Sequence, residues 1–220
     1  EHEVTIDRQS ISATLLSTAL TLFHVGRSQM RQGRGVYFYL PKLESVPEAE
    51  LYKDLFDSSR DLLHLDSDST IKAIILVESL PAVFRMENML YALGKYGAGL
   101  NAARWDLKAS ILEYILPDPK SVWPDRFEVD IKTTKFMSNI FRRLVAICLK
   151  RKAVAIGGMA TALPSRDEEV NQIAADSIKS DKEWEARQGF LRGWSAHIYH
   201  MKTASDPFKE WWGTGWQPTV

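Results

Sequence analysis

The run Ile71–Val77 (IKAIILV) constrains the fold more than any other feature of the sequence. It is almost purely aliphatic, and no apolar run in the chain approaches the roughly 20 residues of a membrane-spanning helix. A strand with apolar side chains on both faces is typical of a parallel sheet that is covered on both sides. The run therefore predicts a buried parallel strand in an α/β protein.

Strand-like and helical patterns alternate along the rest of the chain. Val36–Leu40 is aromatic and β-branched and is closed by Pro41, which predicts a strand. Helical patterns are predicted for Ile11–Arg31, Glu48–Leu65, Leu80–Lys95 and Phe136–Arg151, and Asp167–Gly189 reads as a polar, charged helix. Further strands are predicted at Ala153–Ile156, which opens into a turn at Gly157 and Gly158, and at Trp194–His197, whereas Gly97 and Gly99 read as breaks after a helix.

Strands that alternate with helices in this order predict a parallel sheet. A barrel of eight strand–helix units needs at least about 200 residues, and this chain has 220. We therefore expect an α/β fold of the TIM (β/α)8 type, minimal or incomplete. The barrel is expected over residues 1–208, followed by an aromatic tail at 209–220 whose tryptophans either pack locally or anchor a partner.

Charge and cysteine content exclude several functions. The 28 basic and 28 acidic residues cancel without forming a basic stripe, so direct contact with nucleic acid is not expected. No transmembrane segment is expected either. The single cysteine, Cys148, cannot form an internal disulfide, which fits a reducing compartment or an organelle matrix.

Two carboxylates follow predicted strands. Glu78 comes directly after Ile71–Val77, and Asp106 ends the stretch that begins at Gly97. In a barrel the functional groups lie at the carboxyl ends of strands, where two carboxylates on neighbouring strands can share a Mg²⁺ ion that keeps several waters. Two unrelated strand-end carboxylates are the alternative, and spacing alone leaves both open.

Several ordered motifs resemble those of the malate synthase family in its shorter form. Gly35–Ser45 (GVYFYLPKLES) is similar to the family's G-P-Y-F-Y-L-P-K-M-E-S, and Gly99–Asp106 (GLNAARWD) is similar to G-L-N-C-G-R-W-D. Further resemblances lie at Ile74–Ser79 (V-L-I-E-T), Trp123–Arg126 (L-P-D-R), Ala155–Ala160 (A-M-G-G-M-A), Asp181–Glu183 and Trp194–His197 (W-V-A-H). The similarity runs from about Val4 to about Phe208, and the chain is identified as a member of this family.

The resemblance implies a TIM-barrel enzyme that condenses glyoxylate with acetyl-CoA. In the family, Mg²⁺ polarises glyoxylate, an aspartate removes a proton from acetyl-CoA and an arginine stabilises the enolate. Glu78 and Asp106 match the two direct metal ligands. The other matching positions are Ala103, Arg104 and Trp105 for substrate and Gly157, Gly158, Met159 and Ala160 for CoA.

The chain departs from the family pattern at the remaining functional positions. Arg85 replaces a glutamate that borders the metal's water shell, so its charge opposes a dication and suits pairing with Glu78 or Asp106 instead. Lys209 stands at the position of the aspartate base, and a protonated lysine cannot accept a proton; Asp206 is a candidate substitute. The family's arginine belongs to a block upstream of Glu1, and its C-terminal helical domain is not matched.

We therefore expect a catalytically inactive, malate synthase-like protein that acts as an accessory subunit of a larger protein assembly. This assembly is expected in the mitochondrial matrix. No cofactor is expected unless the Mg²⁺ site is retained. The alternative is an active malate synthase or acyl-CoA lyase fragment that uses Mg²⁺, located in the peroxisome or glyoxysome or in the cytoplasm. A third reading is a regulator that binds CoA through Gly157–Ala160.

Overall fold

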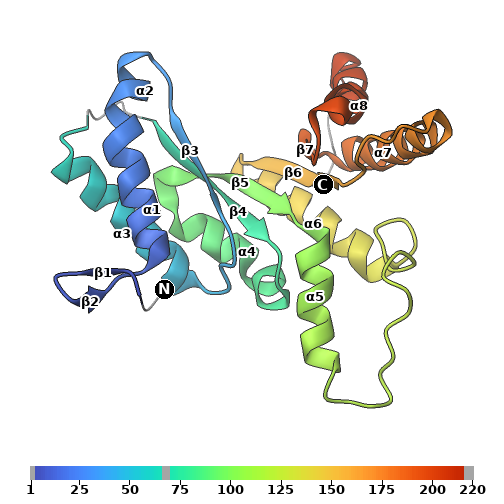
Figure 1. The fold of residues 1–220 in the computed structure, drawn as a ribbon, viewed down its shortest axis with the longest axis horizontal. Helices are drawn as coiled ribbons and strands as arrows, with labels where there is room; N and C mark the ends of the chain where they lie inside the picture. The colour runs from blue at the N-terminus through green and yellow to red at the C-terminus, as the bar shows by residue number, and fades with distance from the viewer. Residues whose placement is uncertain (1–2, 66–69, 216–220) are drawn as a thin grey trace.

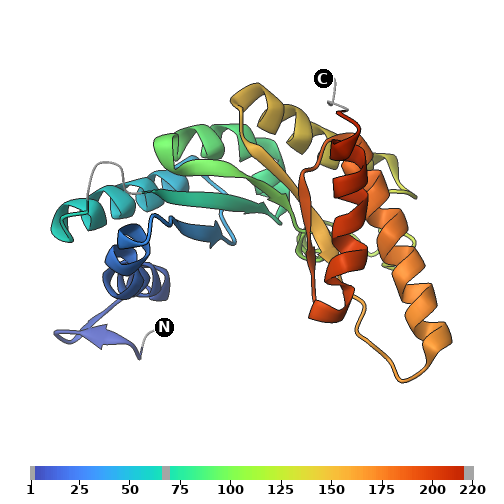
Figure 2. The ribbon, with the colours of Figure 1, turned by 90° about the horizontal axis from the view of Figure 1, so that it is seen from above.

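The structure is a computed structural model that describes residues 3–65 and 70–215. Its centre is a five-stranded sheet in which every neighbouring pair is parallel, in the order β3-β4-β5-β6-β7. The strands are β3 (Val36–Leu40), β4 (Ile71–Val77), β5 (Gly97–Ala102), β6 (Val154–Ala160) and β7 (Arg192–Ser195). The sheet curls into part of a barrel (Figures 1 and 2), so the expected α/β barrel-type fold in incomplete form is confirmed.

Helices follow the strands in the order that the alternation predicts. They are α3 (Val46–Leu62), α4 (Leu80–Ala92), α5 (Arg104–Ile115), α6 (Lys135–Arg151), α7 (Glu168–Gln188) and α8 (Met201–Gly213), with 3₁₀ turns at Gly94–Tyr96 (η2) and Ile198–His200 (η3). Before β3 lie a short hairpin of β1 (Thr5–Ile6) and β2 (Gln9–Ser10), then α1 (Ala13–Thr21), a π-helical turn (η1, Leu22–Gly26) and α2 (Arg27–Arg31). The predicted helix at residues 11–31 is therefore confirmed with a π turn inside it, whereas α5, α8 and the hairpin had no counterpart in the prediction.

The helices cover the outer side of the curved sheet. Figure 2 shows α4 and α6 along this side, and the side chains that face them are the buried ones, such as Ile71, Ala73 and Ile75 of β4. On the inner side Lys72 and Ile74 are only half-buried. Burial on both faces, as predicted for this strand, therefore holds only for its carboxyl-terminal half.

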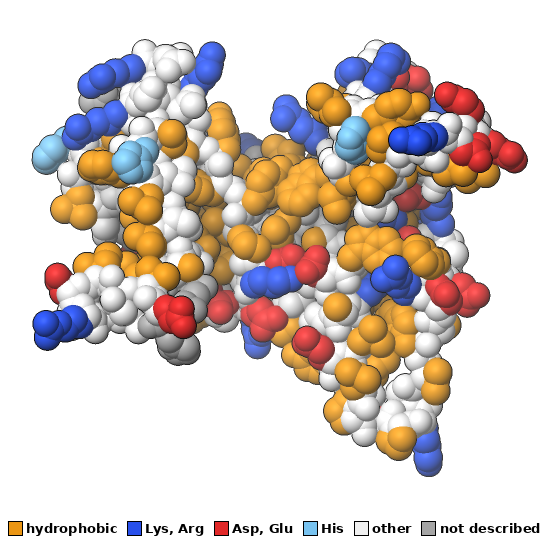
Figure 3. Space-filling view, viewed as in Figure 1, with side chains coloured by type: hydrophobic (Ala, Val, Ile, Leu, Met, Phe, Trp, Pro, Cys, Tyr) orange, Lys and Arg blue, Asp and Glu red, His pale blue; other side chains and the backbone are white. Residues whose placement is uncertain are grey.

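Side chains of the two edge strands meet across the hollow of the sheet. Tyr39 of β3 and Trp194 of β7 pack edge to face with ring centroids 4.8 Å apart, and the Trp194 Nε1–H donates to the Tyr39 hydroxyl at 3.2 Å. These strands are the first and last of the sheet, so the curl brings its edges within side-chain reach. Hydrophobic side chains gather in the hollow between the two halves of the molecule (Figure 3).

Glycines that read as breaks or turns lie inside strands. Gly97 and Gly99 belong to β5, and β6 continues through Gly157 and Gly158 to Ala160, so the predicted break and turn are wrong. The reason is space: a Cβ at Gly99 would lie 2.0 Å from the Val154 carbonyl oxygen of the neighbouring strand. The last predicted strand is also shifted, since β7 covers 192–195 rather than 194–197.

The predicted boundary at residue 208 falls within α8. Two of the tail tryptophans, Trp211 and Trp212, are partly buried against the hydrophobic core, and the Trp212 Nε1–H donates to the Phe190 carbonyl oxygen at 3.4 Å. Local packing therefore accounts for these two, while Trp216 lies outside the described residues. Within residues 3–65 and 70–215, none of the helices has the length and apolar character needed to cross a membrane.

Candidate functional site

Glu78 and Asp106 lie at the same edge of the sheet. Glu78 follows β4 directly and precedes Ser79, whose hydroxyl caps α4 by accepting from the Ala82 N–H. Asp106 lies in the first turn of α5, one element beyond β5, rather than at the strand end predicted for it. Because β4 and β5 are parallel neighbours with Val77 opposite Ala102, both carboxylates emerge side by side. The predicted convergence of the two strands' ends is thus present.

A lysine that the sequence analysis did not single out lies between the two carboxylates. The Lys42 ammonium is 2.5 Å from Asp106 Oδ1 and 3.4 Å from Glu78 Oε2, and its backbone N–H donates to Glu78 Oε1 at 2.5 Å. The hydrogen bond to Asp106, reinforced by the charge of Glu78, raises the pKa of Lys42. Lys42 follows β3, the strand next to β4, and this position at the same sheet edge was the signal that could have identified it.

The side chains of Glu78, Asp106 and Lys42 differ in their exposure to solvent. The Glu78 side chain is 5% exposed, whereas Asp106 is 50% and Lys42 65% exposed. Carboxylate oxygens are the ligands that Mg²⁺ prefers, and this pair already shares a cation, the lysine ammonium. Among residues 3–65 and 70–215 there is no group of three or more His, Cys, Asp or Glu side chains that could hold a metal ion. The two carboxylates alone suit a divalent cation that keeps several water ligands, and such an ion would take the position that the Lys42 ammonium occupies.

Arg85 contacts the loop that carries Lys42. It lies on α4, is exposed, and its Nη1 donates to the Glu44 carbonyl oxygen at 3.2 Å. In the described part of the chain, the cation that Glu78 and Asp106 share is thus Lys42 and not Arg85, contrary to the pairing suggested by the sequence. Arg85 instead ties α4 to the β3–α3 loop.

Arg104 is buried in an ion-pair network. Its guanidinium, 7% exposed, lies 3.0 Å from Asp130 Oδ1 and 3.2 Å from Asp181 Oδ2, and Lys132 also pairs with Asp181 at 2.6 Å. Burial alone would raise the pKa of Asp181, but the charges of Arg104 and Lys132 outweigh it and lower this pKa. The network joins the start of α5 to α7 and to the segment before α6, which fixes the turn that presents Asp106.

The residues beside Arg104 are also held from within the chain. The Ala103 N–H donates to the Val77 carbonyl oxygen at 3.3 Å, which continues the β4–β5 pairing. The Lys108 ammonium lies 4.7 Å from the centre of the Trp105 ring, and Phe127 packs edge to face against the same ring. The roles of Ala103, Arg104 and Trp105 in binding substrate stay predictions.

The glycine pair of β6 receives a buried ion pair from α7. Lys182 and Glu185 are both fully buried and 2.9 Å apart, Glu185 Oε1 accepts from the Gly158 N–H at 2.9 Å, and the Lys182 ammonium donates to the Gly158 carbonyl oxygen. A Cβ at Gly157 would lie 2.0 Å from Glu185 Oε2, so glycine leaves the space for this carboxylate. CoA binding at Gly157, Gly158, Met159 and Ala160 stays a prediction.

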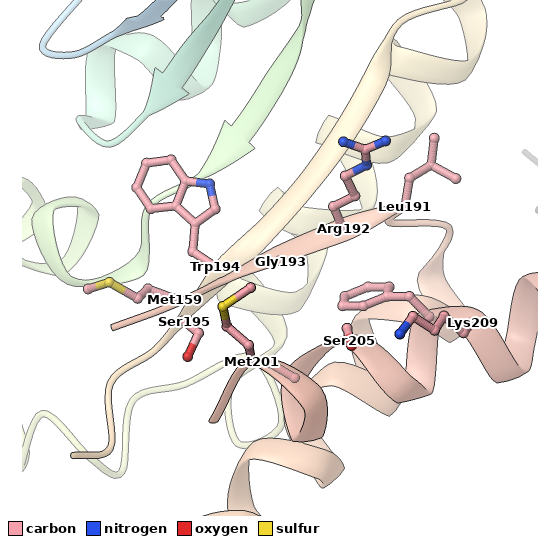
Figure 4. Close-up of a pocket in the computed structure, with 11 residues that line it drawn as sticks. Met159, Leu191, Arg192, Gly193, Trp194, Ser195, Met201, Ser205 and Lys209 are labelled. Carbon is pink, nitrogen blue, oxygen red and sulfur yellow. The ribbon is translucent and has the colours of Figure 1, made fainter. Parts of the chain in front are cut away.

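A groove of about 590 Å³ lies between β7 and α8 (Figure 4). Its lining is mostly apolar and includes Met159, Trp194 and Phe208, with Arg192 and Lys209 adding positive charge. The Lys209 side chain is 73% exposed and lies 3.8 Å from Asp206.

Asp206 is held by lysines. Its Oδ2 lies 2.5 Å from the Lys202 ammonium, and the hydrogen bond from Lys202 lowers the pKa of Asp206, with Lys209 acting in the same direction. A carboxylate of lowered pKa is a weaker base than an ordinary one. The absence of a base at Lys209 and the weak substitution by Asp206 stay predictions.

Known proteins match almost the whole chain. The family model for the malate synthase TIM barrel domain matches residues 1–215. Malate synthase A of Escherichia coli is 39% identical over 210 residues, covering 96% of this chain and 39% of that protein. The glyoxysomal malate synthase of Candida tropicalis is 37% identical over 198 residues, covering 90% and 36%. The chain thus spans about two fifths of the length of these relatives.

Solved structures share the fold at lower sequence identity. A citrate lyase from Burkholderia xenovorans superimposes with a TM-score of 0.60 over 92% of this chain and 66% of that one, at 16% identity. At this identity the likeness supports the barrel-type architecture alone.

Proposed function

The chain belongs to the malate synthase family, and we propose that it serves the reaction of that family, the condensation of glyoxylate with acetyl-CoA. The observation that supports this proposal most directly is the pair of Glu78 and Asp106, which emerge from neighbouring strands and share one cation. Mg²⁺ bound to these carboxylates would polarise the carbonyl group of glyoxylate. The proposal concerns a chain that covers about two fifths of its relatives' length.

The protein's own contribution is to place the two carboxylates. The buried Glu78 is oriented by the Lys42 backbone N–H, and Asp106 is presented by a helix whose first residue, the buried Arg104, is anchored by two ion pairs. Preorganised ligands bind a cation without having to pay for reorganisation. The pair is therefore suited to hold a substrate–metal complex in one orientation.

A second candidate function, a catalytically inactive accessory subunit, is favoured by α8. The residue at the family's base position, Lys209, is an exposed cation, and the neighbouring carboxylate of Asp206 is occupied by Lys202. In this arrangement α8 supplies no strong base. Under this second proposal the barrel acts by binding protein partners.

One assay separates the two proposals. The chain is incubated with glyoxylate, acetyl-CoA and Mg²⁺, and release of the CoA thiol is followed, with Glu78→Gln as a control that keeps the side chain's shape. Thiol release at about 1 s⁻¹ or faster, lost in Glu78→Gln and dependent on glyoxylate, supports catalysis. Release no faster than without the protein contradicts it. The native particle size in an extract of the source then tests the subunit proposal, and a particle with the mass of a single copy contradicts that proposal too.

For the location of the protein we propose the peroxisome or glyoxysome. The matching relatives from Candida tropicalis and Gossypium hirsutum are both named glyoxysomal, whereas no observation supports the mitochondrial matrix expected at first. Microscopy of the natural full-length protein carrying a fluorescent tag tests this, and overlap with a mitochondrial marker instead of a peroxisomal one would refute it.

A further inference from the structure

The carboxylate pair of Glu78 and Asp106 carries its own cation. We propose that the Lys42 ammonium is a resident competitor for a divalent cation, which binds only when the Lys42 side chain leaves the pair. The inference rests on the same carboxylates as the proposed function, but it concerns cation binding and not turnover. It assigns to Lys42 a role as a gate on the site.

The backbone of Lys42 is fixed independently of its ammonium group. The residue has φ +58°, a left-handed conformation that is unfavourable for a side chain larger than glycine. Its N–H is held by Glu78 Oε1, and two residues further on the Glu44 carbonyl oxygen accepts from Arg85. These contacts hold the main chain in place whether or not the ammonium group stays on the pair.

The loop is also fixed on the side of α3. Ser45 and Glu48 form a reciprocal capping box at the start of this helix, and the Glu48 carboxylate accepts from the backbone N–H groups of Glu44 and Ser45 at 2.7 and 2.9 Å. The loop is thus bound to β4, α4 and α3. The main chain of the loop is therefore held while the exposed side chain of Lys42 can change rotamer.

The side chain itself can leave without unfolding anything. The Lys42 side chain is 65% exposed and that of Asp106 50%, so the ammonium group is held next to solvent beside the buried Glu78. A flexible, four-carbon stem allows the ammonium group to move into water by rotamer changes alone. Binding of the metal and release of the lysine are therefore coupled through a single side chain.

Charge explains why the two cations exclude each other. Glu78 and Asp106 supply two negative charges. The Lys42 ammonium, 2.5 Å from Asp106 and 3.4 Å from Glu78, balances one of these charges. A dication placed between the same oxygens would repel an ammonium group that remained there. Since an exposed ion pair contributes only modestly, removal of both contacts of Lys42 should strengthen divalent cation binding roughly 10-fold.

Titration with Mn²⁺, followed by electron paramagnetic resonance and calorimetry, tests this inference. Lys42→Met keeps the backbone N–H and removes the charge, and we expect it to bind Mn²⁺ roughly 10-fold more tightly than the natural chain. Lys42→Arg keeps the charge and should stay within about 3-fold of the natural chain. The gain in Lys42→Met should disappear when Glu78→Gln and Asp106→Asn are added.

A matched control is provided by Lys53, which pairs with Asp54 at 3.7 Å and Asp57 at 3.1 Å on α3. Lys53→Met makes the same change in total charge beside two carboxylates, so equal gains in both variants would reduce the effect to general charge and overturn the proposal. A folded Lys42→Met protein that binds Mn²⁺ no more tightly than the natural chain would also overturn it. If the natural chain releases no CoA thiol but Lys42→Met still binds Mn²⁺ more tightly, the proposed reaction is refuted and this inference stands.

Discussion

The buried pair of Lys182 and Glu185 allows a stability prediction with a definite size. Both side chains are fully buried, their charged atoms are 2.9 Å apart, and both also bond to the backbone of Gly158. The perturbations are Lys182→Met and Glu185→Gln, which remove one charge each while nearly preserving volume. Each leaves the other charge buried without its partner.

The expected cost follows from that isolated charge. Breaking a buried ion pair by removing one partner typically costs about 3–5 kcal/mol, a large share of the roughly 5–15 kcal/mol that stabilises a domain. Glu185 keeps the nearby charge of Arg104 after Lys182→Met, whereas after Glu185→Gln the Lys182 ammonium keeps neutral acceptors such as the Gly158 carbonyl oxygen but loses the carboxylate charge beside it. We therefore expect about 3 kcal/mol for Lys182→Met and about 5 kcal/mol for Glu185→Gln.

Urea unfolding followed by circular dichroism measures both values. With a slope of about 2 kcal/mol per molar urea, losses of this size lower the midpoint by roughly 1.5–2.5 M. In the double variant, where no charge is left unpaired, the loss should be smaller than the sum of the single losses by more than about 1 kcal/mol. Losses below about 1 kcal/mol in both single variants, or additive losses in the double variant, would refute the account.

Two further predictions concern strand glycines and acid stability. Gly157→Ala should destabilise the protein by about 2 kcal/mol or more, because its Cβ would lie 2.0 Å from Glu185 Oε2. Gly26→Ala, whose Cβ meets nothing within 4 Å in a helical segment, should stabilise the protein by roughly 0.5–1 kcal/mol. Urea midpoints that shift in the same direction in both variants would contradict this. A hydrogen bond from Tyr96, together with Lys95 and Lys53, lowers the pKa of Asp57 from 3.8 to about 2, so its stabilising contribution is present above about pH 4 and is lost as the pH falls through 2. Because Asp57 is partly exposed and its charge is screened, we expect the natural chain to lose only about 1 kcal/mol more unfolding free energy than Asp57→Asn between pH 4 and pH 2. Asp54→Asn is the control and should behave like the natural chain. Equal losses in the natural chain and Asp57→Asn would contradict the prediction.

The parallel sheet was predictable because its signal is local. The aliphatic composition of Ile71–Val77 and the alternation around it depend on nearest neighbours in the chain. The positions of Gly99 and Gly157 in strands were not predictable in this way. Each glycine leaves space for a group that is distant in sequence, the Val154 carbonyl in one case and the Glu185 carboxylate in the other.

In the site, too, the features that depend on local sequence could be predicted, and those that depend on residues distant in sequence could not. That Glu78 and Asp106 lie side by side follows from parallel neighbouring strands, which an alternating pattern implies. Which cation they share depends on the side-chain reach of Lys42 and Arg85, two residues on different elements. Sequence alone gave Arg85 the greater weight because it departs from the family pattern, whereas Lys42 conforms to it.

The direction of α8 bears most directly on the choice between the two proposed functions. All five strands are parallel, so Lys42, Glu78 and Asp106 follow β3, β4 and β5 at the carboxyl edge of the sheet. The helix α8 begins at Met201 beyond the end of β7 and runs back along that strand, so that Lys209 lines the groove with Leu191 and Arg192 at the strand's beginning (Figure 4).

At 1.5 Å per residue, Lys209 lies about 12 Å along the helix axis from Met201, away from the carboxyl edge. A base must come within hydrogen-bond distance of the proton that it removes. We therefore expect that replacing Lys209 by aspartate would restore the family's residue without bringing a carboxylate to the Glu78–Asp106 edge. If the chain proves to be an active enzyme, its base must reach the Glu78–Asp106 edge from a residue other than Lys209 or from α8 in a different position.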